Sequence, residues 1–170
     1  SLLDSCTSPK EYVEKAKELG QTALCFTEHG NIFNWFEKKK LCEENGIKYL
    51  HGIECYVTET LDEKIRDNYH TVLIAKNYNG FVEINNLFRK SYEESHTYYK
   101  HRISFEEFLN ISDNVIKISA CLQSPLNRYR LKIQDNYTEE QKNNLVKLLK
   151  HYDYYEIQYH NNEEQIEFNQ

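Results

Sequence analysis

The chain has 170 residues, of which 39% are hydrophobic and 14% aromatic, so it is long and apolar enough to bury the core of one folded domain. Its formal net charge is −6, which argues against a module whose main task is to bind a nucleic-acid backbone, because such modules are usually basic. No apolar run has the length of a transmembrane helix, and the opening SLLDSCTSPK lacks the regions of a signal peptide, so we expect no membrane segment.

The first third of the chain predicts two helices and two strands in alternation. Thr7-Ser8-Pro9 is a typical helix start, with an N-cap hydroxyl followed by proline in the first turn, and Gly20 is a typical helix end. The short apolar run at 22–26 has the length of a strand. A helical pattern returns at 33–45, and residues 47–58 again predict a strand.

The rest of the chain continues this alternation after a polar loop at 61–68. We expect strands at 70–77, 115–121 and 154–160, and helices at 81–92 and 138–150. The least regular stretch, 91–104, indicates an insertion or a flexible loop. Alternating elements with short connections predict a single α/β domain over residues 1–170, with a parallel sheet that is either open or closed into a barrel.

The five cysteines are odd in number, and no two of them form a C-x-x-C pair. This pattern argues against a zinc ribbon and against a disulfide framework, and favours reduced thiols in a cytoplasmic protein.

Polar residues with metal-binding side chains stand within or beside the predicted strands and before the first predicted helix. They are Asp4, before the first helix; His29, after the first strand; Glu54, within the second; His70, at the start of the third; and Cys121, at the end of the fourth. Functional groups of parallel α/β folds gather at strand ends, and these residue types bind divalent transition metals that assist phosphoester hydrolysis. By spacing alone, hydrogen-bonded structural histidines and a packed cysteine explain the same pattern.

Several segments together have the order and spacing of one known family. SLLD, TEHGN, GIKYLHGIECYV, HTVLIAKN and ISACL resemble the segments SLLDG, TDHGN, GIKPIIGCEAYV, HLTLLAKN and LSACL of the PHP (polymerase and histidinol phosphatase) domain at the N-terminus of bacterial DNA polymerase III alpha subunits. The resemblance covers nearly the whole chain.

The resemblance implies a distorted (β/α)7 barrel, similar to a triosephosphate-isomerase barrel but one unit short. It implies a site for up to three divalent ions, Zn²⁺ or Mn²⁺, which in some members supports a 3′–5′ proofreading exonuclease. Carried over by position, the ligands are Asp4, His29, Glu54, His70 and Cys121, whereas His160 is a structural or rim residue.

The sequence also departs from the family pattern. The family's opening His-x-His falls before Ser1 and its closing Asp-x-His beyond Gln170, so we expect an incomplete barrel and metal site, with weak metal binding and little hydrolysis by the chain as given. Glu28 stands where the family has Asp beside the ligand His29, and its extra methylene either serves the same role or misplaces that ligand. We expect His51 at the rim, and His96, His101 and His151 in solvent without a role.

Three functions are compatible with these observations. The first is a PHP domain of a cytoplasmic DNA polymerase III alpha subunit, with the remaining polymerase domains, DNA and a proofreading exonuclease subunit as partners. The second is an inert PHP scaffold that stabilises the polymerase or docks a separate exonuclease. The third is a stand-alone phosphoesterase like histidinol phosphatase.

Overall fold

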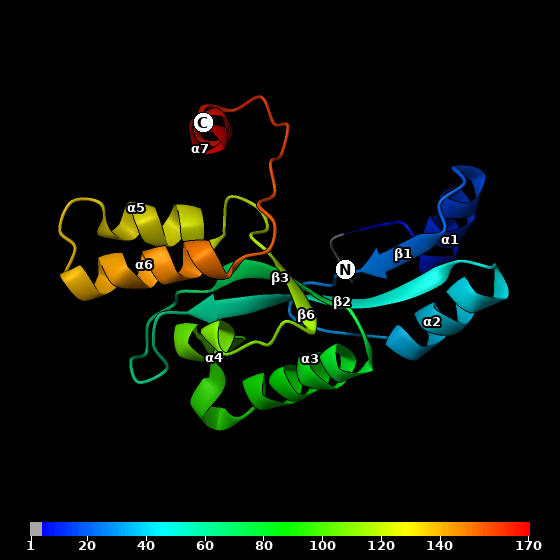
Figure 1. Ribbon diagram of the computed structural model, residues 1–170, viewed down its shortest axis with the longest axis horizontal. Coiled ribbons are helices and arrows are strands. Elements are labelled where there is room, and N and C mark those ends of the chain that lie inside the picture. Colours follow the sequence, from blue (N-terminus) through cyan, green and yellow to red (C-terminus); the bar gives the residue numbers. More distant parts are fainter. Residues whose placement is uncertain (1–4) are drawn as a thin grey trace.

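A six-stranded mixed sheet runs through the computed structural model, which describes residues 5–170 (Figure 1). Its strands are β1 (Ala23–Phe26), β2 (Lys48–Thr58), β3 (Tyr69–Ala75), β4 (Thr97–Tyr98), β5 (Lys100–Ser104) and β6 (Val115–Ile118). The α-helices are α1 (Pro9–Glu18), α2 (Trp35–Glu44), α3 (Tyr78–Ser91), α4 (Phe105–Leu109), α5 (Arg130–Ile133), α6 (Glu139–His151) and α7 (Glu163–Asn169). A 3₁₀-helix, η1 (Glu94–His96), and a π-helix, η2 (Pro125–Tyr129), complete the elements.

Strand β2 organises the sheet. Parallel β1 pairs with its first half and parallel β5 with its second half, while antiparallel β3 lies along the other edge and pairs in turn with antiparallel β6. The prediction of a parallel sheet is therefore wrong. The loop between β2 and β3 contains no crossover helix, and neighbouring strands joined in this way pair antiparallel. Within residues 5–170 the sheet is not closed into a barrel.

The predicted helix starts are confirmed by their caps. The Ser8 hydroxyl accepts the Glu11 N–H at 3.3 Å, the Glu11 carboxylate accepts the Ser8 N–H at 2.6 Å, and Pro9 occupies the first turn of α1. Thr138 and Gln141 form the same reciprocal pair at the start of α6. Each pair satisfies N–H groups that a helix end leaves without an intrahelical partner.

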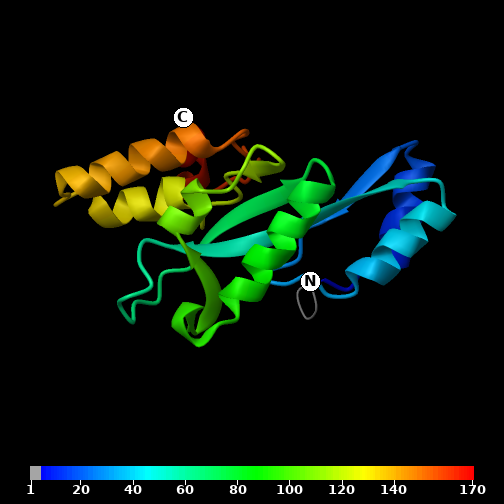
Figure 2. The same ribbon diagram turned by 60° about the horizontal axis from the view of Figure 1, so that its bottom comes forward.

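Two apolar clusters hold the elements together. The larger lies between the sheet and helices α3, α4 and α6, and includes Leu73, Ile84, Phe108 and Leu148. The smaller packs α1 and α2 against β1, and consists of Val13, Ala16, Cys42 and Ile47. Figure 2 shows the unit of α1, β1 and α2 at one end of the long strand β2, opposite α5 and α6.

The segment 154–160 does not form the predicted strand. Only Tyr154 makes a bridge, to Ile118, and beyond it Ile157 and Tyr159 are 72% and 102% exposed. No neighbouring strand supplies hydrogen-bond partners there within the described part of the chain, so an apolar run of strand length stays extended without joining the sheet.

The segment 91–104 is more ordered than its sequence indicates. It contains η1, β4 and β5, and Arg102 within β5 is only 2% exposed. The Arg102 guanidinium donates to the carbonyls of Ile65 and Asp67, each at 2.7 Å, and so anchors the polar loop between β2 and β3. A tertiary contact thus buries a charged side chain that sequence patterns assign to solvent.

Two histidines expected at the rim or in solvent are buried. His51 is 5% exposed and packs between Trp35 and Phe81. His96 is 6% exposed, and its Nε2 lies 2.9 Å from the Glu107 carboxylate. Both expectations are wrong, because each ring finds a partner from an element distant in the sequence.

None of the helices formed by residues 5–170 is both long enough and apolar enough to cross a lipid bilayer.

Candidate metal centre

Glu54, in the middle of β2, is the centre of a cluster of potential metal ligands. Its side chain is buried, and its backbone is fixed on both sides: its N–H donates to the Glu28 carbonyl at 3.1 Å, and its carbonyl accepts the Gly30 N–H at 2.8 Å. These two bonds fasten the turn after β1 to β2. They place His29 so that its Nδ1 hydrogen-bonds the Glu54 carboxylate.

Gly30 makes this close approach possible. It has φ +63°, a conformation that side chains disfavour, and a Cβ there would lie 2.5 Å from Cε2 of Tyr56. A side chain at position 30 would therefore force the Tyr56 ring to move before the turn could fit against β2.

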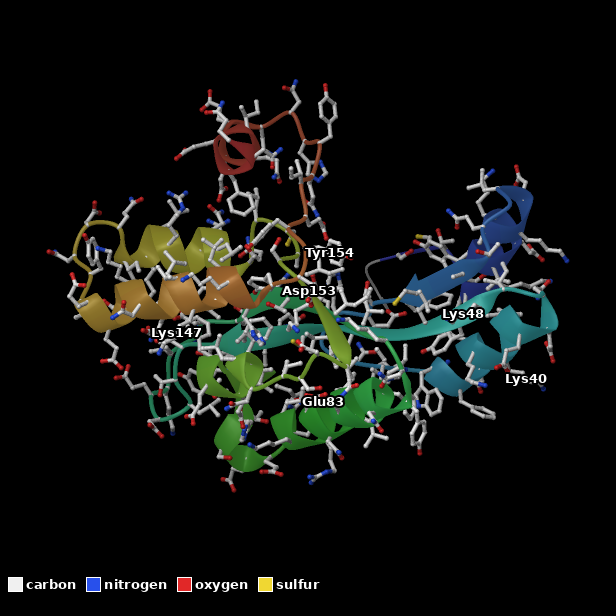
Figure 3. All side chains as sticks on the ribbon, in the orientation of Figure 1. Lys40, Lys48, Glu83, Lys147, Asp153 and Tyr154 are labelled. Carbon is white, nitrogen blue, oxygen red and sulfur yellow. The ribbon has the colours of Figure 1, made fainter. Side chains whose placement is uncertain are left out.

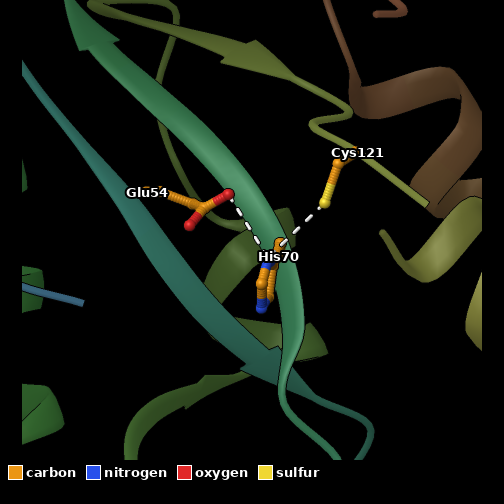
Figure 4. A group of neighbouring side chains, drawn as sticks. All are labelled: Glu54, His70 and Cys121. Carbon is orange, nitrogen blue, oxygen red and sulfur yellow. Dashed lines mark hydrogen bonds and ion pairs between the residues drawn. The ribbon is translucent and has the colours of Figure 1, made fainter. Parts of the chain in front are cut away.

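The second histidine and the cysteine come from the other edge of β2. His70, in β3, lies opposite Tyr56, and its Nδ1 is 3.3 Å from Glu54 Oε1. Cys121 follows β6, where Ala120 turns the chain with φ +57°, and its Sγ lies 3.6 Å from His70 Nδ1. Figure 4 shows His70 between the carboxylate and the thiol.

The geometry suits a divalent transition metal. Ligand atoms of Glu54, His70 and Cys121 all lie within 4.8 Å of one another, and His29 contacts the same carboxylate. Carboxylate, imidazole and thiolate are the three donor types that Zn²⁺ binds in proteins. The donor set therefore fits the ion that the family resemblance implies.

The charges of the cluster also favour a cation. Burial by itself raises the pKa of the Glu54 carboxyl, but His70 and His29 outweigh burial and hold that pKa below its ordinary value. Burial by itself lowers the pKa of His70, yet the Cys121 thiol and the Glu54 carboxylate raise it to about 9. A proton on His70 thus holds the place that a bound cation would take, since metal ligation requires neutral imidazole.

The structure brings together four of the five residues proposed from the sequence: His29, Glu54, His70 and Cys121. Asp4 lies outside the described residues. His160 is exposed at the end of the extended segment and is not among the residues whose ligand atoms converge.

Two neighbours of the cluster, Tyr56 and Lys38, were not predicted from the sequence. The Tyr56 ring packs 5.2 Å from the His70 ring, between that ligand and Gly30. The Glu28 carboxylate is ion-paired with Lys38 of α2, whose side chain is only 7% exposed. The position of Tyr56 was predictable, because Tyr56 follows Glu54 by two residues and so lies on the same face of the strand. The ion pair was not, because nothing in the sequence pairs Glu28 with a lysine ten positions later.

Comparison with known proteins identifies the family of the chain. The sequence matches the PHP domain family over residues 1–160. The chain belongs to the PHP domain family. Relatives of this PHP domain include DNA polymerase III subunit alpha of Treponema pallidum, 37% identical over 132 residues, and of Aquifex aeolicus, 35% identical over 134 residues. The same subunit of Borreliella burgdorferi is 32% identical over 152 residues.

These alignments cover 74%, 72% and 86% of the PHP domain chain but only 11%, 12% and 13% of the respective polymerase subunits. The chain thus spans a small part of the curated relatives that it matches.

A solved structure supports the fold. The crystal structure of a Bifidobacterium adolescentis protein, provisionally described as a metal-dependent phosphoesterase, superposes with a TM-score of 0.53 and 15% identity. The match covers 96% of the PHP domain chain and 77% of the other protein. The α/β, PHP-type fold expected from the sequence is confirmed, with the sheet left open.

Proposed function

We propose that this PHP domain is part of a bacterial DNA polymerase III alpha subunit and carries a metal-dependent phosphoesterase site of the 3′–5′ exonuclease type. The observation that supports the site most is the convergence of Glu54, His70 and Cys121, with His29 on the same carboxylate. These residues come from four separate segments, and a metal ion bound by all of them would account for that convergence. We propose Zn²⁺ or Mn²⁺ as the ion and Asp4 as a further ligand.

Each residue has a distinct role in this proposal. Glu54 has two carboxylate oxygens that face different histidines, so both oxygens would be available to a divalent metal. His29 and His70 would supply neutral nitrogen ligands, and Cys121 would supply a thiolate. A bound divalent ion lowers the pKa of a water molecule and neutralises charge on a phosphoryl oxygen. The half-exposed His29 marks the side from which a phosphoester substrate reaches the cluster, since Glu54 itself is buried.

The remaining domains of the polymerase chain, DNA and a proofreading exonuclease subunit are the partners expected of such a domain. Because bacterial DNA is replicated in the cytoplasm, the proposed role places the protein there.

An inert scaffold is the second candidate, and one observation favours it. The Glu28 carboxylate, beside His29, is held by the buried ammonium of Lys38, which also lies 5.2 Å from the Phe26 ring centroid. A carboxylate neutralised by a lysine is a weaker electrostatic support for a neighbouring metal ligand. A stand-alone phosphoesterase is the third candidate, and the family likeness to polymerase subunits speaks against it.

Metal content and nuclease activity together test the proposal. We expect a chain that includes the family's opening His-x-His and closing Asp-x-His to bind Zn²⁺ in a stoichiometric amount, measured by mass spectrometry of the metal after dialysis, and to degrade single-stranded DNA from its 3′ end in the presence of Zn²⁺ or Mn²⁺. The chain as given should bind the metal more weakly and hydrolyse little. Glu54→Gln and His70→Asn should lose both properties. His160→Asn is the matched control, because His160 is exposed and is not among the residues whose ligand atoms converge.

The outcomes separate the three candidates. Metal binding without DNA degradation would contradict the exonuclease and leave a structural metal. A folded chain that binds no metal and is inert would favour the scaffold. Hydrolysis of small phosphate monoesters in preference to DNA would favour the stand-alone phosphoesterase.

A further inference from the structure

A cavity of about 500 Å³ lies where β2 begins, β3 ends and helices α2 and α3 start (Figure 1). Five of its lining side chains are aromatic rings: Trp35, Tyr49, His51, Tyr78 and Phe81. Phe81 is the common neighbour, with its ring centroid 5.2 Å from Trp35, 4.6 Å from His51 and 6.0 Å from Tyr78. We refer to this space and its lining residues as the aromatic cavity.

The aromatic cavity is separate from the candidate metal centre. Successive side chains of a strand point to opposite faces of the sheet, and His51 and Glu54 are three positions apart in β2. The cavity and the metal centre therefore lie on opposite faces of the same strand, and the function of one does not account for the other.

The charge around the cavity is opposite to that of the whole chain. Its lining contains three lysines and neither Asp nor Glu, although the chain has 27 acidic and 21 basic residues. Lys39 pairs with Glu43 at 2.5 Å, but neither Lys48 nor Lys76 forms an ion pair with any residue in the described range. Both of these ammonium groups are on exposed residues, and Figure 3 shows Lys48 on the outer part of β2.

The floor of the cavity is aromatic and uncharged. Burial lowers the pKa of His51 to about 4, so its imidazole is neutral at physiological pH, and its Nδ1 lies 3.1 Å from the Tyr49 hydroxyl oxygen. At the mouth, Tyr78 is 76% exposed and lies nearly parallel to Phe81, with 19° between the ring planes. The exposed Tyr78 ring therefore lies beside two ammonium groups, Lys48 and Lys76, that form no ion pair within residues 5–170.

We propose that the aromatic cavity binds single-stranded nucleic acid, with a base against the Trp35, Tyr78 and Phe81 rings and the adjoining phosphates at Lys48 and Lys76. Sequence-tolerant binding of single strands combines these two elements, because every base has a face that stacks on an aromatic ring and every phosphate attracts an ammonium group. An apolar peptide would gain nothing from the lysines, and an inorganic anion would gain nothing from the rings. The inference goes beyond the proposed hydrolysis and does not depend on it.

Trp35 reports directly on occupancy, because it is the single tryptophan of the chain. Titration with a short oligothymidylate should quench the fluorescence of Trp35, and the quenching should be weaker at high salt. Tyr78→Ala should weaken binding about 5- to 150-fold, the loss typical for removing one stacking ring. Replacing both lysines, Lys48→Gln with Lys76→Gln, should reduce the slope of log affinity against log salt by about 1.4, since each phosphate contact on a single strand contributes about 0.7.

The matched control replaces two exposed lysines of α6, Lys147→Gln with Lys150→Gln, and should leave affinity and salt slope unchanged. Lys147 is at the far end of the molecule from Lys48 (Figure 3). Circular dichroism of each variant verifies that it is folded, and Tyr78 is exposed enough for its removal to leave the core intact. Control variants that match the effect of Lys48→Gln with Lys76→Gln would overturn the assignment.

Thymidine monophosphate and polyglutamate test whether the cavity prefers a nucleic-acid strand to a free nucleotide or to an acidic protein segment. Thymidine monophosphate at equal nucleotide concentration should quench Trp35 far less than the oligothymidylate, and equal quenching would overturn the assignment to a strand in favour of a free nucleotide. Polyglutamate should leave Trp35 fluorescence unchanged. Quenching by polyglutamate that Tyr78→Ala abolishes would overturn the assignment in favour of an acidic protein segment.

Discussion

The turn that carries His29 depends on the glycine at position 30, and the substitution Gly30→Ala tests this dependence. Three glycines of the chain have positive φ angles of similar size: Gly20 at +68°, Gly30 at +63° and Gly46 at +70°. A Cβ at Gly20 or Gly46 meets nothing within 4 Å, whereas a Cβ at Gly30 meets the Tyr56 ring at 2.5 Å. Gly20→Ala and Gly46→Ala are therefore controls that measure the cost of alanine at a positive φ angle without the steric contact.

The expected losses differ accordingly. Holding alanine in the left-handed region costs roughly 1–2 kcal/mol, and this should be the whole effect of Gly20→Ala and Gly46→Ala. At position 30 the new methyl also forces the Tyr56 ring to move, and overpacking of this kind costs about 1–3 kcal/mol. Gly30→Ala should therefore lower the free energy of unfolding by about 2–5 kcal/mol.

Urea denaturation followed by circular dichroism measures these differences, and the midpoints compare directly if the dependence on urea concentration is unchanged. Because Tyr56 packs on His70, Gly30→Ala should also weaken Zn²⁺ binding, while Gly46→Ala should not. Equal destabilisation by all three substitutions would refute the reasoning, since it would mean that the contact with Tyr56 carries no cost.

Three other predictions follow from particular contacts. Arg102→Met should lower the free energy of unfolding by about 2–3 kcal/mol, because it removes charged hydrogen bonds to the carbonyls of the 61–68 loop. Urea denaturation measures this loss, and a loss as small as that of the exposed control Arg66→Met would contradict the prediction. Burial raises the pKa of the Glu107 carboxyl, but His96 and Lys90 outweigh burial and lower that pKa to about 2. The ionised carboxylate therefore stabilises the fold above its ordinary pKa of 4.5, and this contribution is lost as the pH falls from 4.5 toward 2. Urea midpoints of the parent should fall more steeply than those of Glu107→Gln over this range, and parallel curves would count against the pairing. Zn²⁺ at 100 times its dissociation constant should raise the free energy of unfolding of the parent by about 2.7 kcal/mol, measured by urea denaturation. Cys121→Ser should show no such increase, and an equal increase for that variant would exclude Cys121 as a ligand.

Local sequence signals predicted the elements that local physics decides. The Ser8 and Thr138 caps, the helices that follow them and the strands around Glu54 and His70 are all where hydrogen-bonding side chains and apolar runs indicate. The convergence of His29, Glu54, His70 and Cys121 was also foreseeable, because their segments match the order of one family.

The errors arose where a distant partner decides the outcome. The run at 154–160 has the composition of a strand, but a strand needs a neighbour that offers free backbone groups. The direction of β3 depends on how the loop after β2 returns, and the sequence pattern of a buried strand is the same in either direction.

The sequence by itself therefore determined the capped helices and the strands around Glu54 and His70, since caps and apolar runs act over a few positions, and the order of the family segments marked the candidate metal ligands. Only the tertiary structure decided that Lys38 neutralises Glu28, that His51 is buried among aromatic rings, and that Gly30 must remain a glycine. The physical reason is that burial, ion pairing and steric contact depend on atoms that are close in space, and segments far apart along the chain supply those atoms.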